Sequence, residues 1–244
     1  MTKTDLMRPP PSWLDELPKH RLLAEMSLWS ADLGRLADDA ARVAPFTDIF
    51  HVDVADGHFA PAMLYFPDLV ARVRKETNIP LHVHLMVADP ILIAQVEQFA
   101  EAGADLISVH AENANAAAAL ARIGALGLKS GLVLQLHTPV SAAAAFLPTI
   151  GMLTLLGTRI GVKGQGLDAE AEPRLRAAAK LIAASQARQR IVLAADGGIR
   201  EHTVPGLRRA GAETIVMGSL AFGAGDLAAR MGWVRDMPGP APTA

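Results

Sequence analysis

Ala102-Gly103-Ala104-Asp105-Leu106-Ile107-Ser108-Val109-His110 joins the end of an alanine-rich segment to a short apolar run. Gly103 stands where a helix must stop before the next strand, because glycine tolerates the left-handed backbone of a helix C′ position. Ala210-Gly211-Ala212-Glu213 repeats this pattern directly before the run Thr214–Met217. The two stretches predict repeated βα units with a parallel sheet.

Eight short apolar runs alternate with longer alanine-rich segments along the chain. We expect strands at Leu23–Ser27, Phe50–Val54, Leu81–Leu85, Leu106–His110, Gly131–Leu136, Met152–Leu156, Ile191–Ala195 and Thr214–Met217. Eight strands with intervening helices in about 200 residues match a (β/α)8 barrel, whereas an open doubly wound sheet usually has fewer strands. The predicted fold class is therefore α/β, a closed (β/α)8 TIM barrel.

Ser30 stands before a helical pattern in which Leu33, Leu36, Ala40 and Val43 recur at spacings of three and four. We expect Ser30 to cap this helix, because a serine hydroxyl accepts hydrogen bonds from the first backbone N–H groups. The apolar face should pack on the barrel. Apolar helix faces also allow a homo-oligomer, whose symmetry the sequence does not set.

The chain has 244 residues, a length that leaves one α/β barrel and two smaller domains both open. One domain is the working assumption. We expect an N-terminal extension over residues 1–20, a catalytic barrel over 21–235 and a flexible C-terminal tail over 236–244. The tail follows from Pro238-Gly-Pro-Ala-Pro, which cannot hold a regular helix or a central strand.

Composition and charge exclude several classes of partner. The formal net charge of −2 comes without a dominant block of one sign, so we expect neither a nucleic-acid partner nor an anionic membrane surface. The absence of cysteine excludes disulfides and thiolate metal sites and leaves His and Asp as metal ligands. No apolar run reaches the roughly 18 residues of a membrane span, and the first residues do not resemble a signal peptide. We expect a cytoplasmic protein.

Polar side chains interrupt the second and third predicted strands and follow the seventh. Residues two apart in a strand point the same way, so His51 and Asp53 share one face, as do His82 and His84. Asp196 lies at a carboxyl strand end, where barrel active sites lie. His51, Asp53, His84 and Asp196 therefore predict a site for one divalent ion. We place Zn²⁺ first, and the ligand set leaves Mn²⁺, Fe²⁺ and Co²⁺ open.

Each of these residues, taken alone, could instead have a purely structural role. A strand histidine is about as often a hydrogen-bonded core residue, and Asp196 could simply cap the following helix. Taken together, their shared location makes the alternative unfavourable, because burying this many ionisable groups without a metal or a substrate would be costly.

Glycine-rich segments follow the last three predicted strands: Gly161-Val-Lys163-Gly164-Gln165-Gly166, Asp196-Gly197-Gly198 and Gly218-Ser219. Phosphate sites in this fold are commonly made there, because glycines let backbone N–H groups approach an oxyanion. Each segment alone is more often a simple turn. Lys163 is either an added point charge or a solvated loop residue. Three segments on adjacent strands together predict a phosphate site.

Longer motifs run in order along the chain. Ser27-Leu-Trp-Ser30-Ala-Asp32 is followed by His51-Val-Asp53-Val-Ala-Asp56-Gly57-His58-Phe59, and then by Val83-His84-Leu85-Met86-Val87, Val109-His110, Thr138-Pro139, Asp196-Gly197-Gly198 and Gly218-Ser219. From about Leu22 to Gly223 these motifs resemble the ribulose-phosphate 3-epimerase family. The family versions of the first two read Ser-Ile-Leu-Ser-Ala-Asp and His-Val-Asp-Val-Met-Asp-Gly-His-Phe.

The resemblance implies a barrel of the ribulose-phosphate-binding type and a metal held by residues matching His51, Asp53, His84 and Asp196. It also implies that Asp53 and Asp196 act as base and acid. They would remove the proton at C3 of a ketose phosphate, such as D-ribulose 5-phosphate or D-xylulose 5-phosphate, and reprotonate the ene-diolate from the other face.

Further residues of these motifs are expected beside the substrate. Ser27 and Gln165 are the expected hydrogen-bond partners. Met86 either covers the reacting carbon or fills the barrel mouth. His58 and His110 match family positions and either act directly or orient a loop or a strand end.

Departures from the family pattern cluster near the expected pocket. The family's Asn-Pro-Gly-Phe-Gly-Gly-Gln loop is Arg159-Ile-Gly-Val-Lys-Gly-Gln165 here, Leu136-His137 replaces the Asn-Pro before Thr-Pro, and the aspartate usual two residues before the metal-site histidine is His82. These changes leave open another ketose phosphate, such as allulose 6-phosphate or a tetrulose phosphate. A non-catalytic sugar-phosphate-binding barrel, an aldolase and a decarboxylase are the competing functions.

Overall fold

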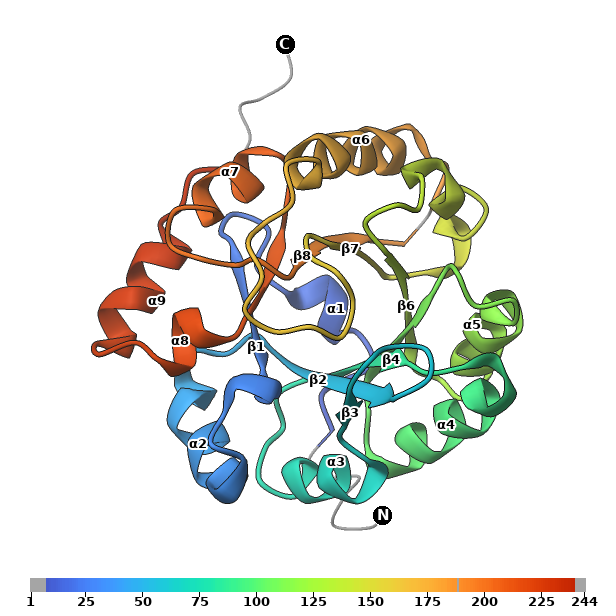
Figure 1. Cartoon of the computed structure of the whole chain (residues 1–244), viewed down its shortest axis with the longest axis horizontal. Coiled ribbons are helices and arrows are strands. Elements are labelled where there is room, and N and C mark those ends of the chain that lie inside the picture. Colours follow the sequence, from blue (N-terminus) through green and yellow to red (C-terminus); the bar gives the residue numbers. More distant parts are fainter. Residues whose placement is uncertain (1–7, 188, 240–244) are drawn as a thin grey trace.

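Parallel strands close into a barrel that the helices surround (Figure 1). The structure is a computed structural model that describes residues 8–187 and 189–239. The barrel strands are β1 (Leu23–Ser27), β2 (Ile49–Asp56), β4 (Leu81–Met86), β5 (Leu106–His110), β6 (Lys129–Leu134), β7 (Met152–Leu156), β8 (Val192–Asp196) and β9 (Thr214–Met217). Because β1 pairs with both β2 and β9, the sheet closes on itself, and the predicted (β/α)8 TIM barrel is confirmed.

Some of the strand bounds differ from the prediction. β2 and β4 run longer, β8 is displaced by one residue so that it includes Asp196, and β3 (Met63–Leu64) pairs antiparallel with the end of β2. The largest difference is in β6, which was predicted at Gly131–Leu136. Gln135 lies outside that strand because its backbone N–H donates to the Glu112 carboxylate (3.0 Å) instead of to a neighbouring strand.

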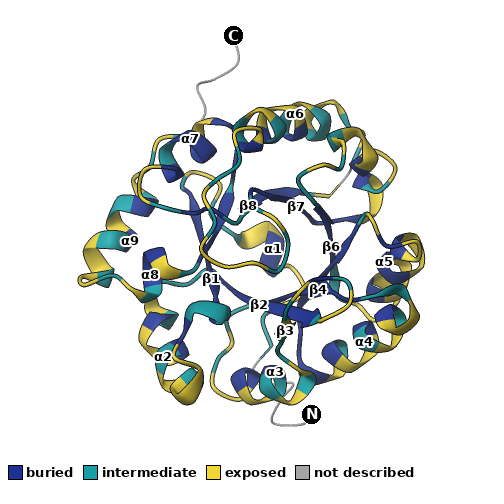
Figure 2. Cartoon of the chain, in the orientation of Figure 1, coloured by how far each residue is buried: buried dark blue, intermediate teal, exposed yellow. Residues whose placement is uncertain are grey.

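Helices follow the strands around the outside of the barrel. The α-helices after the first barrel strand are α2 (Leu36–Val43), α3 (Pro67–Arg74), α4 (Asp89–Ala102), α5 (Ala116–Ala125), α6 (Ala171–Ala184), α7 (Val204–Arg209), α8 (Ser219–Phe222) and α9 (Leu227–Arg235). The 3₁₀-helices are η2 (Leu28–Ser30), η3 (Leu33–Arg35), η4 (Ala44–Phe46), η5 (Val140–Ala143) and η6 (Leu147–Thr149). Figure 2 shows buried strands inside a ring of helices whose outer sides are exposed.

The helix ends agree with the prediction at two glycines and differ at Ser30. Gly103 and Gly211 have φ angles of 108° and 114°, the left-handed conformation expected after a helix. Ser30 ends η2, and the predicted cap is wrong: the Asp32 carboxylate caps η3 by accepting the Gly34 backbone N–H (3.0 Å). The break into η3 and α2 leaves Leu33 61% exposed, so only the later part of the predicted apolar face is buried.

A short helix closes the amino end of the barrel. α1 (Trp13–Glu16) packs its two buried apolar side chains, Trp13 and Leu14, against the first residues of several strands, such as Leu23 and Ile49. Arg190 donates hydrogen bonds to the carbonyl oxygens of Leu14 (3.2 Å) and Leu17 (2.8 Å). This part of the predicted extension therefore shares the core of the barrel, and the boundary at residue 20 stays a prediction.

The last helix ends where the predicted barrel ends. α9 stops at Arg235, and Met237 still packs against the core. Residues 240–244 of the predicted flexible tail lie outside the described residues. Among the described residues, no helix combines the length and the apolar character needed to cross a membrane.

Candidate active site

Four titratable side chains converge inside the carboxyl end of the barrel. His51 and Asp53 come from β2, His84 from β4 and Asp196 from the end of β8. Asp53 and His84 are register partners on adjacent strands, and one ligand atom from each of the four residues lies within 4.8 Å of the others. The convergence expected from strand alternation is found, whereas the role of the four residues as metal ligands stays a prediction.

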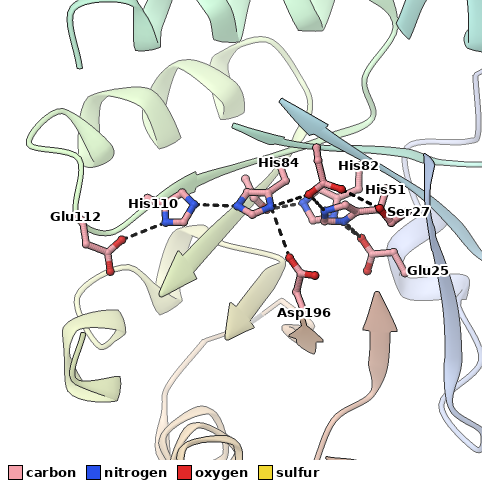
Figure 3. Close-up of polar contacts among 10 residues, drawn as sticks. Glu25, Ser27, His51, His82, His84, His110, Glu112 and Asp196 are labelled. Atoms are coloured by element: carbon pink, nitrogen blue, oxygen red, sulfur yellow. Dashed lines mark hydrogen bonds and ion pairs between the residues drawn. The ribbon is translucent and has the colours of Figure 1, made fainter. Parts of the chain in front are cut away.

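The distances within this cluster are those of direct contact (Figure 3). His51 Nε2 lies 3.1 Å from Asp53 Oδ1. His84 Nδ1 lies 3.5 Å from Asp53 Oδ1 and 3.7 Å from Asp196 Oδ2. The two aspartates therefore share one environment, although they come from different walls of the barrel.

The cluster fits a divalent cation. Within the described part of the chain, the buried His84 Nδ1 has no hydrogen-bond partner, although it faces two carboxylates. A buried polar atom without a partner is costly. Imidazole nitrogens with carboxylate oxygens are a donor set that suits Zn²⁺ and its neighbours in the first transition series. A cation would use His84 Nδ1 and His51 Nε2 and would neutralise both aspartates.

Charges inside the cluster separate the proton affinities of its members. Burial by itself lowers the pKa of His51, but Asp53 and Glu25 raise it well above its usual range. Burial raises the pKa of Asp53, but His51 and His84 outweigh it and hold that pKa well below its usual range. For Asp196, burial, with Asp53 adding to it, raises the pKa to about 6. The two carboxylates thus differ in proton affinity, as an acid and a base at one site must.

A second buried group, Glu25, lies beneath the cluster. Its Oε1 is 2.7 Å from His51 Nδ1 and 2.5 Å from His82 Nδ1, and His82 Nε2 is 2.7 Å from Ser108 Oγ. These distances are hydrogen-bond lengths. Two ligand atoms that each lie about 2.0–2.2 Å from one tetrahedral ion are farther apart than this, so Glu25 and the two histidines do not form an ion site in this arrangement. Burial raises the pKa of Glu25, but His82 and His51 lower it to about 2.

Sequence reasoning missed Glu25 and left the role of His82 open. Glu25 is the only charged residue of β1, and this isolated carboxylate in an apolar strand was the available signal. His82 does not join the four clustered residues, because its Nδ1 faces Glu25 and its Nε2 faces Ser108.

A second chain of polar groups leads from His84 toward the surface. His84 Nε2 lies 2.8 Å from His110 Nε2, and His110 Nδ1 lies 3.1 Å from Glu112 Oε2. Glu112 also accepts hydrogen bonds from the Gln135 backbone N–H and the Thr138 hydroxyl. His110 therefore orients His84 with its Nδ1 toward the two aspartates.

A cavity of about 560 Å³ opens above the cluster, a size that suits a small ligand. Asp53, His84 and Asp196 line it. Its walls include every residue predicted to bind substrate or phosphate: Ser27, Met86, Gly161, Lys163, Gly164, Gln165, Gly197, Gly198, Gly218 and Ser219. The sequence-predicted binding residues are thus brought to one cavity, and their contacts with a ligand stay predictions.

The glycines of this wall are required by their backbone or their surroundings. Gly161, Gly164 and Gly198 have φ angles of 67°, 80° and 70°, a region that side chains other than glycine rarely adopt. A Cβ on Gly218 would lie 2.5 Å from the Ser30 hydroxyl oxygen. Around a Cβ on Gly164 the space is open, and this residue lines the cavity.

Several side chains of the wall have partners within the protein. Ser27 donates its hydroxyl hydrogen to Asp53 (2.8 Å). Lys163 donates to the Trp29 carbonyl oxygen, and its ammonium lies 4.8 Å from the centre of the Trp29 ring. Gln165 donates to two carbonyl oxygens of its own loop and accepts from Arg159 Nε (3.0 Å). Gln165 therefore shapes the loop in this conformation.

The two divergent residues His137 and Arg159 lie beside a smaller cavity. It has a volume of about 350 Å³, and its walls also include Gln135, Leu136 and Ile160. Arg159 and Ile160 line the larger cavity as well. Residues in which this chain departs from the family pattern therefore adjoin the candidate active site.

The barrel and the clustered residues at its carboxyl end define an enzyme of the (β/α)8 class. The chain belongs to the ribulose-phosphate 3 epimerase family, whose sequence model matches residues 23–222. It is accordingly a carbohydrate epimerase of the isomerase class.

Curated relatives are similar over most of their length. The ribulose-phosphate 3-epimerase of Bacillus subtilis is 34% identical over 202 residues, which are 82% of this chain and 92% of the relative. That of Mycobacterium bovis is 35% identical over 216 residues, 88% of this chain and 92% of the relative. That of Synechocystis is 36% identical over 221 residues, 88% of this chain and 94% of the relative.

Solved structures at lower identity share the fold alone. A 3-hexulose-6-phosphate synthase aligns with a TM-score of 0.64 and 19% identity over 89% of this chain and 100% of its own. The orotidine 5'-phosphate decarboxylase of Pyrococcus horikoshii aligns with a TM-score of 0.63 and 15% identity over 88% of this chain and 98% of its own.

Proposed function

We propose that the protein inverts C3 of a ketose phosphate, interconverting D-ribulose 5-phosphate and D-xylulose 5-phosphate. The observation that carries this proposal is the position of Asp53 and Asp196. Both line one cavity within 4 Å of His84 Nδ1, and they reach it from different walls of the barrel. Two carboxylates on opposite sides of a carbon atom are what inversion by proton transfer requires. The named activity of the relatives supports the choice of substrate.

The proton transfers follow from the different proton affinities of the two aspartates. One carboxylate removes the C3 proton, which leaves the substrate as an ene-diolate, and the other carboxylic acid returns a proton to the opposite face. Asp196, whose pKa is raised to about 6, takes up a proton more readily than Asp53, whose pKa is held low by its histidine neighbours. Reversal of the two roles gives the reverse reaction.

A divalent cation fits this chemistry. His51, Asp53, His84 and Asp196 would hold it, with Zn²⁺ first and Mn²⁺, Fe²⁺ or Co²⁺ as alternatives. When bound, it would stabilise the negative charge that develops on the substrate oxygens, a contribution of several kcal/mol. Ser27 would keep Asp53 in place through its hydroxyl.

The glycine-rich loops that line the cavity would hold the phosphate of the substrate. Gly164, Gly197, Gly198, Gly218 and Ser219 line the cavity, and their backbone N–H groups would bind the phosphate oxygens while Lys163 adds a positive charge. Met86 and Trp29 would cover the sugar and limit the access of water. The cytoplasmic location and the homo-oligomer expected from the sequence stay predictions.

One feature of the cavity wall favours a substrate other than D-ribulose 5-phosphate. Arg159 lies between the main cavity and the smaller cavity beside His137, where a longer or differently placed polar chain would meet it. A different ketose phosphate, such as allulose 6-phosphate or a tetrulose phosphate, is therefore the alternative substrate for the same reaction.

The experiment is an NMR assay in D₂O with the Zn²⁺-loaded protein and a panel of four-, five- and six-carbon ketose phosphates. Epimerisation places deuterium at C3 of one substrate, and the product has the same carbon skeleton. Loss or gain of carbon would indicate an aldolase or a decarboxylase instead. Saturable binding without deuterium exchange across the panel would indicate a non-catalytic sugar-phosphate-binding barrel.

A further inference from the structure

Glu25 is a buried charge that the proposed reaction does not use directly. It projects into the barrel from the middle of β1 and has no exposed surface. Figure 3 shows it next to His51, at the opposite end of the row of histidines from His110 and Glu112. Burying a carboxylate is costly unless hydrogen bonds and opposite charge compensate. The cost is compensated here by His51 and His82, so the three residues form one hydrogen-bonded unit.

The chemistry of this unit sets which nitrogens carry hydrogen. An ionised carboxylate only accepts hydrogen bonds, so both His51 and His82 donate their Nδ1–H to Glu25 Oε1. His82 then accepts the hydroxyl hydrogen of Ser108 at Nε2. In His51 the remaining nitrogen, Nε2, lies 3.1 Å from Asp53 Oδ1 and belongs to the candidate metal cluster. With Nδ1 as the donor to Glu25, Nε2 is the nitrogen that can bind a cation when it gives up its own proton.

We propose that Glu25 is the positioning residue of the metal centre, which holds His51 with its Nε2 lone pair directed at the cation. The inference rests on the proposed function. Glu25 does not line the cavity, and it reaches the four clustered residues through His51. Carboxylates that accept the second N–H of a metal-binding histidine fix its tautomer and its ring orientation, and they strengthen it as a ligand.

Position 82 offers a second place for the same carboxylate. β2 lies between β1 and β4, and His82 is the register partner of His51, with ring centres 4.8 Å apart. An aspartate at this position would adjoin His51 from β4 in the way that Glu25 does from β1. The double variant Glu25→Ala/His82→Asp therefore moves the carboxylate across the strand without removing it.

The test measures the dissociation constant of Co²⁺ by competition with a chelator and records the visible absorption of the bound ion. We expect Glu25→Gln and Glu25→Ala to bind Co²⁺ about 10–100-fold more weakly and with a shifted absorption spectrum. Glu25→Ala/His82→Asp should recover most of the affinity. Glu25→Gln keeps the side-chain volume and decides the question if the alanine variant does not fold.

A matched control separates positioning from loss of stability. Asp105 is another buried carboxylate of the barrel, paired with Arg74 (2.6 Å) away from the cavity. Asp105→Asn should lower the melting temperature and leave Co²⁺ affinity unchanged. Equal Co²⁺ affinity in the unsubstituted protein and in Glu25→Gln would overturn the positioning role of Glu25 and leave the proposed metal centre in place. Absence of Co²⁺ binding to the unsubstituted protein would reject the metal centre of the proposed function, and the role of Glu25 with it.

Discussion

The Nε2 atoms of His84 and His110 lie 2.8 Å apart, and both imidazoles are buried. At this distance the two nitrogens share one hydrogen, so one ring donates and the other accepts. His84 must leave Nδ1 unprotonated to bind a cation, and its Nε2–H is therefore the donor. His110 accepts it and donates its own Nδ1–H to Glu112 (3.1 Å).

Replacing His110 should therefore weaken the binding of a divalent ion. His110→Phe removes the acceptor for His84, and a Phe ring fits beside Phe59, whose ring centre lies 5.0 Å from that of His110. We expect about 10–100-fold weaker Zn²⁺ affinity, measured by chelator competition. His58→Phe, at an exposed position of the neighbouring loop, is the control and should bind Zn²⁺ normally. Unchanged affinity in His110→Phe would show that His84 needs no such support.

The same variant should change how stability depends on pH. Burial removes water from the protonated form of His110 and lowers its pKa to about 4. A histidine of an unfolded chain has a pKa near 6.5, so the unfolded state binds the proton first as the pH falls. The contribution of neutral His110 to the free energy of unfolding is therefore complete above about pH 6.5. It is lost as the pH falls toward about 4, a change of about 3 kcal/mol.

This pH effect is measured by urea unfolding in the presence of a chelator at several pH values. The difference in unfolding free energy between the unsubstituted protein and His110→Phe should shrink from pH 7 to pH 4. A difference that stays constant over this range would contradict the assignment of a neutral buried His110.

Proton transfer should depend on both aspartates of the cavity. Asp53→Asn and Asp196→Asn each remove a carboxylate that the proposed reaction uses, and we expect deuterium wash-in at C3 to fall by a factor of about 10² or more in each. Asp56→Asn is the control, because Asp56 only accepts loop N–H groups next to the site. Near-normal exchange in both cavity variants would reject the two-aspartate mechanism.

Alanine variants at two glycines should separate the effect on ligand binding from the effect of backbone strain. Gly164 and Gly127 have φ angles of 80° and 77°, and open space surrounds a Cβ at either position. Alanine at either site should therefore cost a similar free energy of unfolding, about 1 kcal/mol. Only Gly164 lines the cavity, so only Gly164→Ala should raise the KM for the ketose phosphate, by several-fold. An equal KM in the two variants would argue against phosphate binding at Gly164.

Metal removal should lower thermal stability through the same four residues. A ligand present at 100 times its dissociation constant stabilises the folded state by about 2.7 kcal/mol, or about 5–10 °C in melting temperature for a chain of this size. We expect this shift on adding Zn²⁺ to chelator-treated protein, followed by calorimetry. His84→Asn should abolish the shift, because His84 Nδ1 is the atom that faces both aspartates.

Much of the candidate site could be predicted from local sequence. Strand alternation alone placed His51 with Asp53 on one face, because successive side chains in a strand point to opposite sides. Gly103 and Gly211 marked the helix ends because a left-handed φ is a local requirement. The predicted cap at Ser30 failed because the competing side chain, Asp32, was better placed for the N–H groups that follow.

Other features depend on how the sheet closes. The pairing of β1 with β2 brings Glu25 against His51, although the two residues are 26 positions apart, and no periodicity in the sequence indicates that contact. Gln135 was predicted in the sixth strand but lies outside it, because its backbone N–H donates to the carboxylate of Glu112 in a neighbouring loop. The sequence by itself therefore determined the strand and helix pattern and the residue types of the site, since these follow from local periodicity and backbone preference. Only the tertiary structure decided which carboxylate supports which histidine, because barrel closure sets the distances between residues that are remote along the chain.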